Sequence, residues 1–328
     1  MKKVLKIFGL DDIMFLVKER GNLQECTLFG IEGGVFMKSF YSSLIKFAGK
    51  MKRYRLTHQF YIFLHKIGVV GLGHRLFSFI YRNNPAHPSQ KWKNEKQFFT
   101  EHAQELKAAY DSLADDRSRS VFENILRFRV EHNYAFIEKS LGKDSEATQY
   151  IVPELPFSDH EIIVDCGAFI GDTAEKFYKN IPGCRVIALE PDKKVFELLQ
   201  QCGLEGLKAI NAGAWSEDTT LKFSDVGGGS SAINTSGNTE IKVAALDHIP
   251  ECQSATYIKM DIEGAELEAL KGAENIIKSR KPKLAICLYH KPQDFYEIPL
   301  YIKKLNPDYK LFVHQHRDDA YETFLYAV

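Results

Sequence analysis

Short apolar runs alternate with segments of helical periodicity from about residue 160 to the end of the sequence. Each apolar run has the length of one buried strand, and the segments between them repeat apolar residues at the spacing of an amphipathic helix. Strands separated by helices pair in parallel, so the pattern predicts an α/β fold: a doubly wound, mostly parallel sheet with helices on both faces. The predicted strands are EIIVDC, RVIALE, LKAINAG, ATYIKMDI and KLAICLY, and the predicted helices are DTAEKFYKNI, PDKKVFELLQQC, AELEALKGAENIIKS and FYEIPLYIKKL.

The two ends of this pattern differ from its middle. The last two apolar runs, YKLFVHQH and TFLYAV, have no helical segment between them, which predicts an antiparallel hairpin at the C-terminal edge of the sheet. Before the sheet, apolar residues recur at helical spacing over residues 98–128, which predicts a mainly helical N-terminal region. We therefore expect three parts: a basic region of uncertain fold at 1–92, a helical cap at 93–155 and the sheet domain at 156–328.

Charge is distributed unevenly, although the net formal charge is zero. Residues 33–94 contain eleven Lys and Arg residues and neither Asp nor Glu, with aromatic residues interleaved. Basic and aromatic residues together are typical of a surface that makes peripheral contact with an anionic membrane. The same face would also fit against the acidic remainder of the chain, and both interpretations stay open. No nucleic-acid recognition motif accompanies the basic residues, so we expect no nucleic-acid partner.

Cysteine usage and hydropathy bear on the compartment. The six cysteines form no CxxC pair and no zinc-like cluster, which indicates reduced thiols in a cytoplasmic protein and predicts no metal site. The first residues do not read as a signal peptide, because Asp11 and Asp12 interrupt the apolar run. The most apolar long segment, 60–81, carries Lys66, Arg75 and three glycines, so we do not expect it to span a membrane.

The stretch EIIVDCGAFIGDT, residues 161–173, places Asp165 at the end of an apolar strand and follows it with Gly167 and Gly171. In a doubly wound sheet, ligands bind where a strand ends and its loop enters the next helix. Glycines let the backbone approach a ligand closely. An ionised aspartate only accepts hydrogen bonds, so it suits an ammonium or a hydroxyl and not a pyrophosphate. The pattern D-x-G-x-x-x-G-D also departs from the GxGxxG of dinucleotide sites, which argues against an NAD-type oxidoreductase.

A second acid, Glu190, follows the strand VIAL in VIALEPD, 25 residues after Asp165. A carboxylate at that position can accept hydrogen bonds from both ribose hydroxyls of an adenosyl group. The two acids and the glycine loop together fit an adenosyl group that carries an amino acid, which is S-adenosylmethionine. Taken singly, each acid is equally well explained as a turn cap or an exposed strand end, so the prediction depends on their order and spacing.

From about Lys93 to Val328 the sequence resembles the FkbM family of S-adenosylmethionine-dependent methyltransferases. The resemblance is carried by LADDRSRSVFENILRFRV, VDCGAFIGDTAEKF, ALEPD, YIKMDIEGAELEALKGA, YHKPQDFYEIPLYI and ETFLYA. The glycine loop is common to many methyltransferases, whereas KMDIEGAELEALKGA with YHKPQD is more specific. The resemblance implies a class I methyltransferase fold, which is Rossmann-like. It also implies methyl transfer to oxygen, often on sugars, glycans or other hydroxylated small molecules.

The resemblance also implies the cofactor contacts position by position. The glycine loop and the ribose acid match the S-adenosylmethionine motifs, and NAGAW, residues 211–215, is expected to flank the adenine. The predicted cofactor-binding residues are Asp165, Cys166, Gly167, Ala168, Gly171, Asp172, Thr173, Glu190, Asn211 and Gly213.

Candidates for the chemistry follow the fourth and fifth predicted strands. YIKMDIEGAE places Asp261 at a strand end and Glu263 before a helix, and AICLYHKPQD places His290 at the next strand end. Methyl transfer needs an aligned acceptor oxygen and removal of its proton, and a neutral imidazole suits the second task. We therefore predict His290 as the base, with Asp261 orienting it or acting as the base itself. The three side chains can also ligate Mg²⁺, although they offer few carboxylates for a hard ion.

Other interpretations stay open. Asp261 can instead contact the methionine end of the cofactor, Glu263 can satisfy amides at a helix start, and His290 can be a packed core residue. The segment SDVGGGSSAINTSG, residues 224–237, is either a flexible crossover loop or a lid over the acceptor. A non-catalytic module that binds S-adenosylmethionine or a nucleotide is the alternative to an enzyme.

Overall fold

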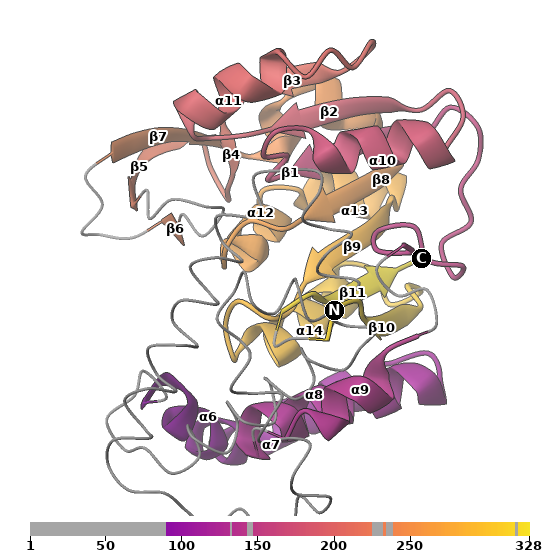
Figure 1. Cartoon of the computed structure of the whole chain (residues 1–328), viewed down its shortest axis with the longest axis vertical. Helices are drawn as coiled ribbons and strands as arrows, with labels where there is room; N and C mark the ends of the chain where they lie inside the picture. Colours follow the sequence, from indigo (N-terminus) through magenta and orange to yellow (C-terminus); the bar gives the residue numbers. More distant parts are fainter. Residues whose placement is uncertain (1–89, 132, 143–146, 225–231, 234–238, 319–320) are drawn as a thin grey trace, which may run out of the picture. The chain divides into compact units, whose positions relative to one another are not determined.

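The computed structural model describes residues 90–328 except 132, 143–146, 225–231, 234–238 and 319–320 (Figure 1). These residues belong to the second of two compact units, residues 74–328. The basic stretch up to residue 89, with the predicted membrane contact, lies outside the described residues, and so does most of the 224–237 segment. The predicted domain boundaries stay a prediction. Within the described part, no helix has both the length and the apolar character needed to cross a membrane.

Seven strands form the main sheet. Its order is β3 (Lys208–Ile210), β2 (Arg185–Leu189), β1 (Ile162–Cys166), β8 (Tyr257–Met260), β9 (Lys283–Cys287), β11 (Thr323–Ala327) and β10 (Leu311–Gln315). The first five of these strands pair in parallel, and β11 is antiparallel to both of its neighbours. This confirms the predicted doubly wound, mostly parallel sheet with an antiparallel pair at its C-terminal side.

The last strand of the chain is not at the edge of the sheet. The predicted hairpin exists, but β11 inserts between β9 and β10, so that β10 forms the edge. All five residues of β11 are buried, because strands flank it on both sides and its alternate residues belong to the apolar clusters of the two faces. Sequence adjacency predicts that two strands pair, but it does not reveal which of them is inserted.

Helices cover both faces of the main sheet (Figure 1). On one face, α10 (Asp172–Asn180) and α11 (Lys193–Gln200) share an apolar cluster with alternate residues of β1 and β2. On the other face, α12 (Glu266–Lys271), α13 (Glu274–Arg280) and α14 (Asp294–Leu305) join the larger apolar cluster. Successive side chains of a strand point to opposite faces, so Ile163 of β1 belongs to the first cluster and Val164 to the second. The strands are mostly apolar because both faces are covered.

The chain enters the sheet through four helices, which confirms the predicted helical N-terminal region. They are α6 (Gln90–Glu101), α7 (Ala103–Asp111), α8 (Asp116–Glu131) and α9 (Ala135–Ser140), and their buried apolar side chains join the same cluster as α14. Arg129 of α8 donates hydrogen bonds of 2.9 and 2.6 Å to the Glu95 carboxylate of α6. A third bond, 3.0 Å long, runs from Arg129 to the backbone carbonyl of Tyr289, just after β9. The buried ion pair therefore links two of these helices to the end of a central strand.

A second sheet follows β3 in the chain and was not predicted. Its order is β4 (Gly213–Ala214), β7 (Thr239–Ala244), β5 (Thr219–Ser224) and β6 (Ala232–Ile233). The prediction of one strand at LKAINAG is wrong, because its two halves pair with β2 in the main sheet and with β7 in the second sheet. The 224–237 segment contains the end of β5 and all of β6 besides residues outside the described part, so the lid stays a prediction.

The predicted helix AELEALKGAENIIKS is divided in two. A Cβ on Gly272 would lie 1.9 Å from the backbone oxygen of Trp215, so only glycine fits where α12 ends. Asp247 lies outside both helices and caps the start of the second one. Its carboxylate accepts hydrogen bonds of 2.8 and 2.9 Å from the amides of Asn275 and Ile276 in α13. The apolar periodicity of the sequence continues across the break, so it does not reveal the break. The break results from contacts with distant parts of the chain.

Candidate active site

The predicted cofactor loop connects β1 to α10. Gly167 has a φ of +78°, and a Cβ on it would lie 2.1 Å from the backbone oxygen of Asp261. Glycine is therefore required by the close approach of the β1 and β8 ends, apart from any ligand. Cys166 and Ala168 are buried, whereas Phe169 and Ile170 are 40% and 42% exposed. The open surface of the loop thus comes from two apolar residues that the sequence did not single out.

The remaining loop residues lead into the helix. Gly171 has left-handed backbone angles and precedes the first turn of α10, which Asp172 and Thr173 begin. The backbone amides of such a first turn have no partners within the helix and carry the positive end of its dipole. The first turn of α10 therefore offers amide donors directly after the loop, whose own Phe169 amide bonds to Glu190.

Asp165 at the end of β1 is fully buried and forms an ion pair with Lys259. The two residues are direct partners in the parallel β1–β8 pairing, and Lys259 Nζ lies 2.9 Å from Asp165 Oδ1. Lys259 also donates a 2.9 Å hydrogen bond to the backbone oxygen of Gly167. Burial alone would lower the pKa of Lys259, but Asp165 and Asp261 raise it above its usual range. The charge of Asp165 is thus compensated within the protein, and its role towards a ligand ammonium stays a prediction.

Glu190 follows β2 and holds two loops through their backbones. One carboxylate oxygen accepts a 3.1 Å hydrogen bond from the amide of Phe169, and the other accepts a 2.9 Å bond from the amide of Asp192. Burial raises the pKa of Glu190 to about 7, against the lowering effect of these two bonds. Each oxygen retains a lone pair for a further donor. Glu190 therefore both shapes the glycine loop and keeps the capacity to accept ribose hydroxyls.

Two further predicted residues lie on the next turn of the chain. The Asn211 amide donates hydrogen bonds of 2.9 and 3.2 Å to the backbone oxygens of Glu190 and Pro191. A Cβ on Gly213 would come within 3.2 Å of Val243 and 3.4 Å of Pro191. These residues fix the backbone beside Glu190. Residues 211–215 are the ones predicted from the sequence to flank the adenine.

Asp261 stands at the end of β8, with its carboxylate between two tyrosines. Tyr289 donates a 3.0 Å hydrogen bond to Asp261 Oδ1, and Tyr150 donates a 3.1 Å bond to Oδ2. Burial by itself would raise the pKa of Asp261, but the Lys259 and His290 cations and hydrogen bonds with Cys287 and Tyr289 hold it below its usual range. Asp261 is therefore ionised at neutral pH and is a weak base.

His290 is held by a buried glutamate. Glu266 is fully buried, and its Oε1 lies 2.8 Å from His290 Nδ1. His290 Nε2 lies 3.7 Å from Asp261 Oδ1 and 3.6 Å from Glu263 Oε2. Burial alone would lower the pKa of His290, but these three acids raise it to about 9. The prediction of a neutral imidazole base is therefore not supported by the electrostatics, because an imidazolium has no lone pair with which to take a proton.

Glu263 is the most exposed of the three predicted catalytic residues. Its side chain is 33% exposed, against 20% for Asp261 and 8% for His290. Burial raises the pKa of Glu263 above its usual range, assisted by the negative charges of Asp261 and Glu266 and opposed by His290. Glu263 also has a positive φ of 56°, a backbone state that is uncommon outside glycine and often occurs at functional sites.

The structure therefore gathers Asp261, Glu263 and His290 into one polar cluster and adds residues that the sequence did not reveal. Lys259 carried a signal, since it is a charge in the middle of an apolar strand. Tyr150 carried none, because it reaches Asp261 from 111 residues away in the sequence. Glu266 read as an ordinary acid of a helical first turn.

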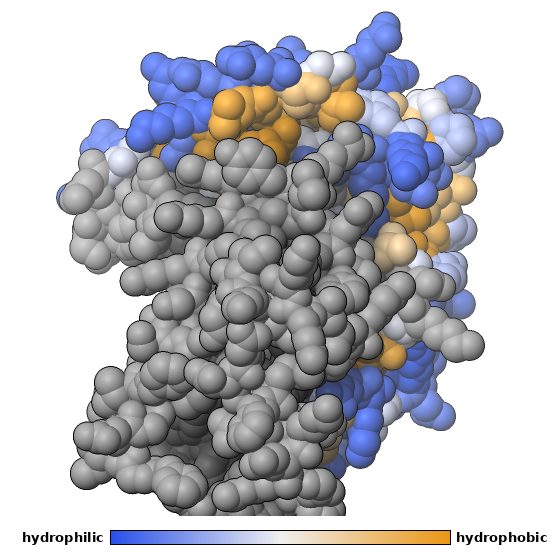
Figure 2. Space-filling model, in the orientation of Figure 1, coloured by the Kyte–Doolittle hydropathy of each residue, from blue (hydrophilic) through white to orange (hydrophobic). Residues whose placement is uncertain are grey.

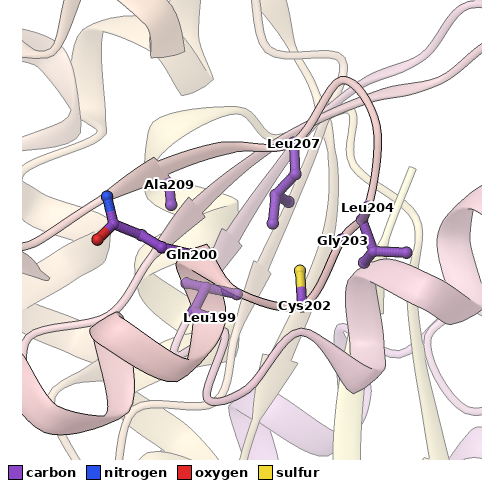
Figure 3. A pocket seen from close by; sticks show the side chains of 7 residues that line it. All are labelled: Leu199, Gln200, Cys202, Gly203, Leu204, Leu207 and Ala209. Atoms are coloured by element: carbon purple, nitrogen blue, oxygen red, sulfur yellow. The ribbon is translucent and has the colours of Figure 1, made fainter.

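A separate hollow lies away from these residues. It has a volume of about 230 Å³ and is lined by the end of α11 and the turn into β3, including Cys202, Leu204 and Leu207 (Figure 3). None of the predicted site residues lines it. The face drawn in Figure 2 is mostly hydrophilic where the residues are described, with small hydrophobic groups between. Neither feature competes with the polar cluster as the site of chemistry.

The strand order, the glycine loop after β1, the acid after β2 and the polar cluster after β8 and β9 together define a class I methyltransferase fold. The cofactor of this class is S-adenosylmethionine. The ligand-binding edge of such a sheet is at the carboxyl ends of its strands, where all of these features lie.

Comparison with known proteins relates one part of the chain to a known family. Residues 165–310 match the family model of the methyltransferase FkbM domain. The crystal structure of methyltransferase FkbM from Methylobacillus flagellatus KT aligns at 29% identity with a TM-score of 0.62, over 71% of this chain and 60% of that one. The chain thus spans about three fifths of that relative. Residues 165–310 form an S-adenosylmethionine-dependent methyltransferase domain of the FkbM type.

More distant structures also align. Fibrillarin from Aeropyrum pernix, in complex with S-adenosylmethionine, is 12% identical with a TM-score of 0.35, over 56% of this chain and 73% of that one. A methyltransferase from Aquifex aeolicus is 13% identical with a TM-score of 0.34, over 60% and 97% of the two chains. Both TM-scores lie below 0.5. A search of curated proteins found no match.

Proposed function

We propose that this chain transfers the methyl group of S-adenosylmethionine to a hydroxyl oxygen on a sugar, a glycan or another small molecule. The observation that carries the proposal is the polar cluster of Asp261, Glu263 and His290 directly beside the cofactor loop. Asp261 is in contact with that loop, because its backbone oxygen occupies the space where Gly167 would carry a Cβ. A methyl donor on the loop would therefore face the cluster across a short distance, as in-line transfer requires.

The charge of the cluster favours a hydroxyl over other acceptors. A carboxylate acceptor would be repelled by Asp261 and Glu263. An amine acceptor would be attracted, but the same carboxylates would stabilise its ammonium form, which has no lone pair to receive a methyl group. A hydroxyl keeps its nucleophilic lone pairs in any of these fields and can donate a hydrogen bond to a carboxylate.

Among the predicted bases, Glu263 is the best suited. Asp261 has a lowered pKa, and His290 is held in its charged form by Glu266. Glu263 combines a raised pKa with the most exposed of the three side chains, and a base works best when its pKa approaches the working pH. We propose that Glu263 accepts the acceptor proton, while the His290 imidazolium and Asp261 hold its surroundings in place.

The proposed binding of S-adenosylmethionine depends on Glu190. Its two bonds to backbone amides keep the carboxylate oriented, and its free lone pairs suit the ribose diol. The exposed side chains of Phe169 and Ile170 in the loop offer apolar surface on which an adenosyl or methionine chain can rest.

The test uses S-adenosylmethionine with a deuterated methyl group. The purified chain is incubated with it and with fractions of a cell extract, and mass spectrometry identifies the products that gain the label. Treatment with mild base distinguishes an ether, which keeps the label, from a methyl ester, which releases it. We expect a labelled ether that does not form with Glu263→Gln. Cofactor binding without any labelled product would support a non-catalytic module, and a label on nitrogen would overturn the choice of acceptor.

A further inference from the structure

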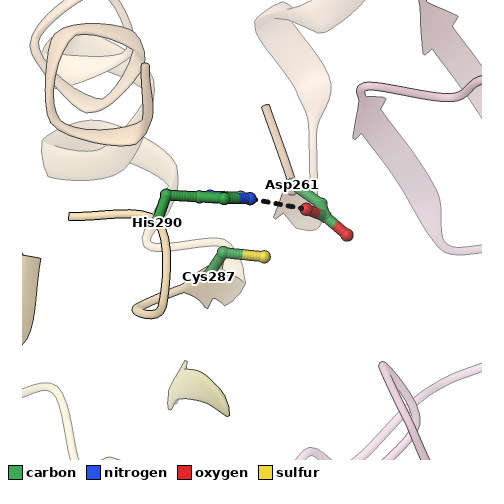
Figure 4. Close-up of side chains that lie close together, drawn as sticks. All are labelled: Asp261, Cys287 and His290. Carbon is green, nitrogen blue, oxygen red and sulfur yellow. Dashed lines mark ion pairs between the residues drawn. The ribbon is translucent and has the colours of Figure 1, made fainter. Parts of the chain in front are cut away.

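The geometry points to a divalent metal site of the zinc type, formed by His290 Nε2, Asp261 Oδ1 and the thiol of Cys287. One ligand atom from each residue lies within 4.8 Å of the other two, so that an ion can contact all three (Figure 4). Asp261 stands after β8, while Cys287 ends β9 and His290 follows it three residues later. Two adjacent strand ends therefore supply the whole set.

The second observation is the unsatisfied nitrogen of His290. The His290 side chain is only 8% exposed, and among the described residues its Nε2 has no hydrogen-bond partner. In Figure 4 this nitrogen points at the Asp261 carboxylate, with Cys287 beside them. A buried polar atom without a hydrogen bond is costly, so native structures rarely keep one unless something else binds there.

The separation of His290 Nε2 from Asp261 Oδ1 exceeds a hydrogen bond and suits two ligands that share an ion, whereas the Cys287 thiol hydrogen-bonds to Asp261 and would lose its proton to bind the ion. His290 Nε2 lies 3.7 Å from Asp261 Oδ1, beyond the usual range of an N–H···O bond. A tetrahedral zinc ion with bonds of about 2.0–2.3 Å keeps its nitrogen, oxygen and sulfur ligands roughly 3.3–3.6 Å apart. The two atoms are thus almost at the separation that an ion between them requires.

The other ring nitrogen shows the arrangement that metal-binding histidines usually have. His290 Nδ1 lies 2.8 Å from Glu266 Oε1, which fixes the ring and keeps a proton on Nδ1, so that an ion binding at Nε2 would displace the second proton of the imidazolium. Asp261 is supported in the same way by the hydroxyls of Tyr150 and Tyr289. These partners orient two of the ligands without occupying the position between them.

The ligand types select the ion. A thiol, an imidazole and one carboxylate suit Zn²⁺ or Co²⁺, whereas Mg²⁺ favours oxygen ligands alone. Three protein ligands leave a fourth position of a tetrahedral ion for water or a substrate oxygen, as in catalytic zinc sites. If the proposed function holds, the acceptor hydroxyl would take that position, beside Glu263, whose Oε2 is 3.6 Å from His290 Nε2. The ion would then make the hydroxyl a stronger acid.

Cobalt provides a direct test, because Co²⁺ replaces zinc and absorbs visible light. The full chain is treated with a chelator and titrated with Co²⁺ alone. We expect visible bands that saturate at one equivalent and a sulfur-to-cobalt charge-transfer band in the near ultraviolet. Cys287→Ser should lose the charge-transfer band and keep weaker visible bands, and His290→Gln should bind cobalt at least tenfold more weakly. A spectrum without the charge-transfer band, or the same band in Cys287→Ser, would overturn the site.

Two controls complete the experiment. Cys252→Ser replaces another fully buried cysteine outside the cluster and should leave the cobalt spectrum unchanged, which separates ligation from general damage to the fold. S-adenosylmethionine binding and methyl transfer are measured on the same metal-free and cobalt-loaded samples. Full transfer without metal would remove the ion from the reaction, whereas cobalt binding without transfer would leave the site standing and count against the proposed function.

Discussion

The two ends of the site each present a carboxylate at the end of a strand, buried in Glu190 and half-buried in Asp261, yet the two carboxylates have opposite electrostatics. Glu190 after β2 is stabilised by two neutral backbone amides, and burial raises its pKa to about 7. Asp261 after β8 has cations nearby, and its pKa is lowered in spite of burial. Glu190 is therefore sensitive to pH near neutrality, while Asp261 keeps a fixed charge. A strand-end acid marks a site, but its neighbours decide its protonation.

The largest expected effect is a loss of turnover without a loss of cofactor affinity, which would separate chemistry at the acceptor end from binding at the cofactor end. Glu263→Gln should lower turnover by about 10²–10⁴-fold, the usual range for loss of a general base. Its affinity for S-adenosylmethionine should stay within about twofold, because Glu263 lies outside the cofactor loop. Rates under saturating cofactor and calorimetric affinities provide the two measurements. Glu268→Gln, a partly exposed glutamate of α12, is the matched control. Equal losses of affinity and turnover would contradict the division into two ends.

The next prediction concerns Lys259, which contributes charge to both ends. Lys259→Met leaves Asp165 buried without its partner, so the free energy of unfolding should fall by about 3–5 kcal/mol. Asp165 can neutralise itself by taking up a proton, so the loss should be smaller at pH 5 than at pH 8. Denaturant titrations at both values measure it. Lys278→Met removes an exposed ion pair on α13 and should cost less than about 1 kcal/mol. A loss of unfolding free energy in Lys259→Met as small as in this control would show that the buried ion pair does not stabilise the fold.

Glu190→Ala tests the cofactor end alone. Removing charge-assisted bonds to the ribose hydroxyls should weaken S-adenosylmethionine binding by about 1.5–3 kcal/mol. Calorimetry on the purified variant gives the affinity, and Glu197→Ala on α11 serves as the control of the same type. Unchanged affinity in Glu190→Ala would exclude Glu190 from the cofactor site.

The smallest predicted effect is a pH dependence of the affinity for S-adenosylmethionine, which comes from Glu190 at the cofactor end. If the ionised form of Glu190 accepts the ribose hydroxyls, affinity for S-adenosylmethionine should fall as the pH drops through 7, by about tenfold between pH 8 and pH 6. In the ligand-free protein the raised pKa favours folding at acidic pH, and this contribution is lost as the pH rises through 7. Affinities across this range, in the native chain and in Glu190→Gln, check the assignment. A slope that persists in the variant would place the titrating group elsewhere.

The sequence by itself determined the class of fold and the positions of the strand-end residues. Strand and helix periodicities are local, so the strands β1, β2, β8, β9, β10 and β11 and the flanking helices were predictable, and with them the acids at the ends of β1, β2 and β8. The second sheet was not predicted: β5 and β7 have six residues each and alternate polar with apolar residues, but the two-residue strands β4 and β6 depend on pairing across the chain. The insertion of β11 and the division between α12 and α13 likewise depend on contacts between distant residues.

Protonation and contact were decided by the tertiary structure alone. Asp165 reads as a free acid in the sequence, but the register between β1 and β8 places Lys259 beside it. His290 reads as a neutral base, but Glu266 and two other acids surround it once α12 folds against the end of β9. Electrostatic interactions depend on distance in space and on exclusion of water, and neither quantity is encoded in local sequence spacing.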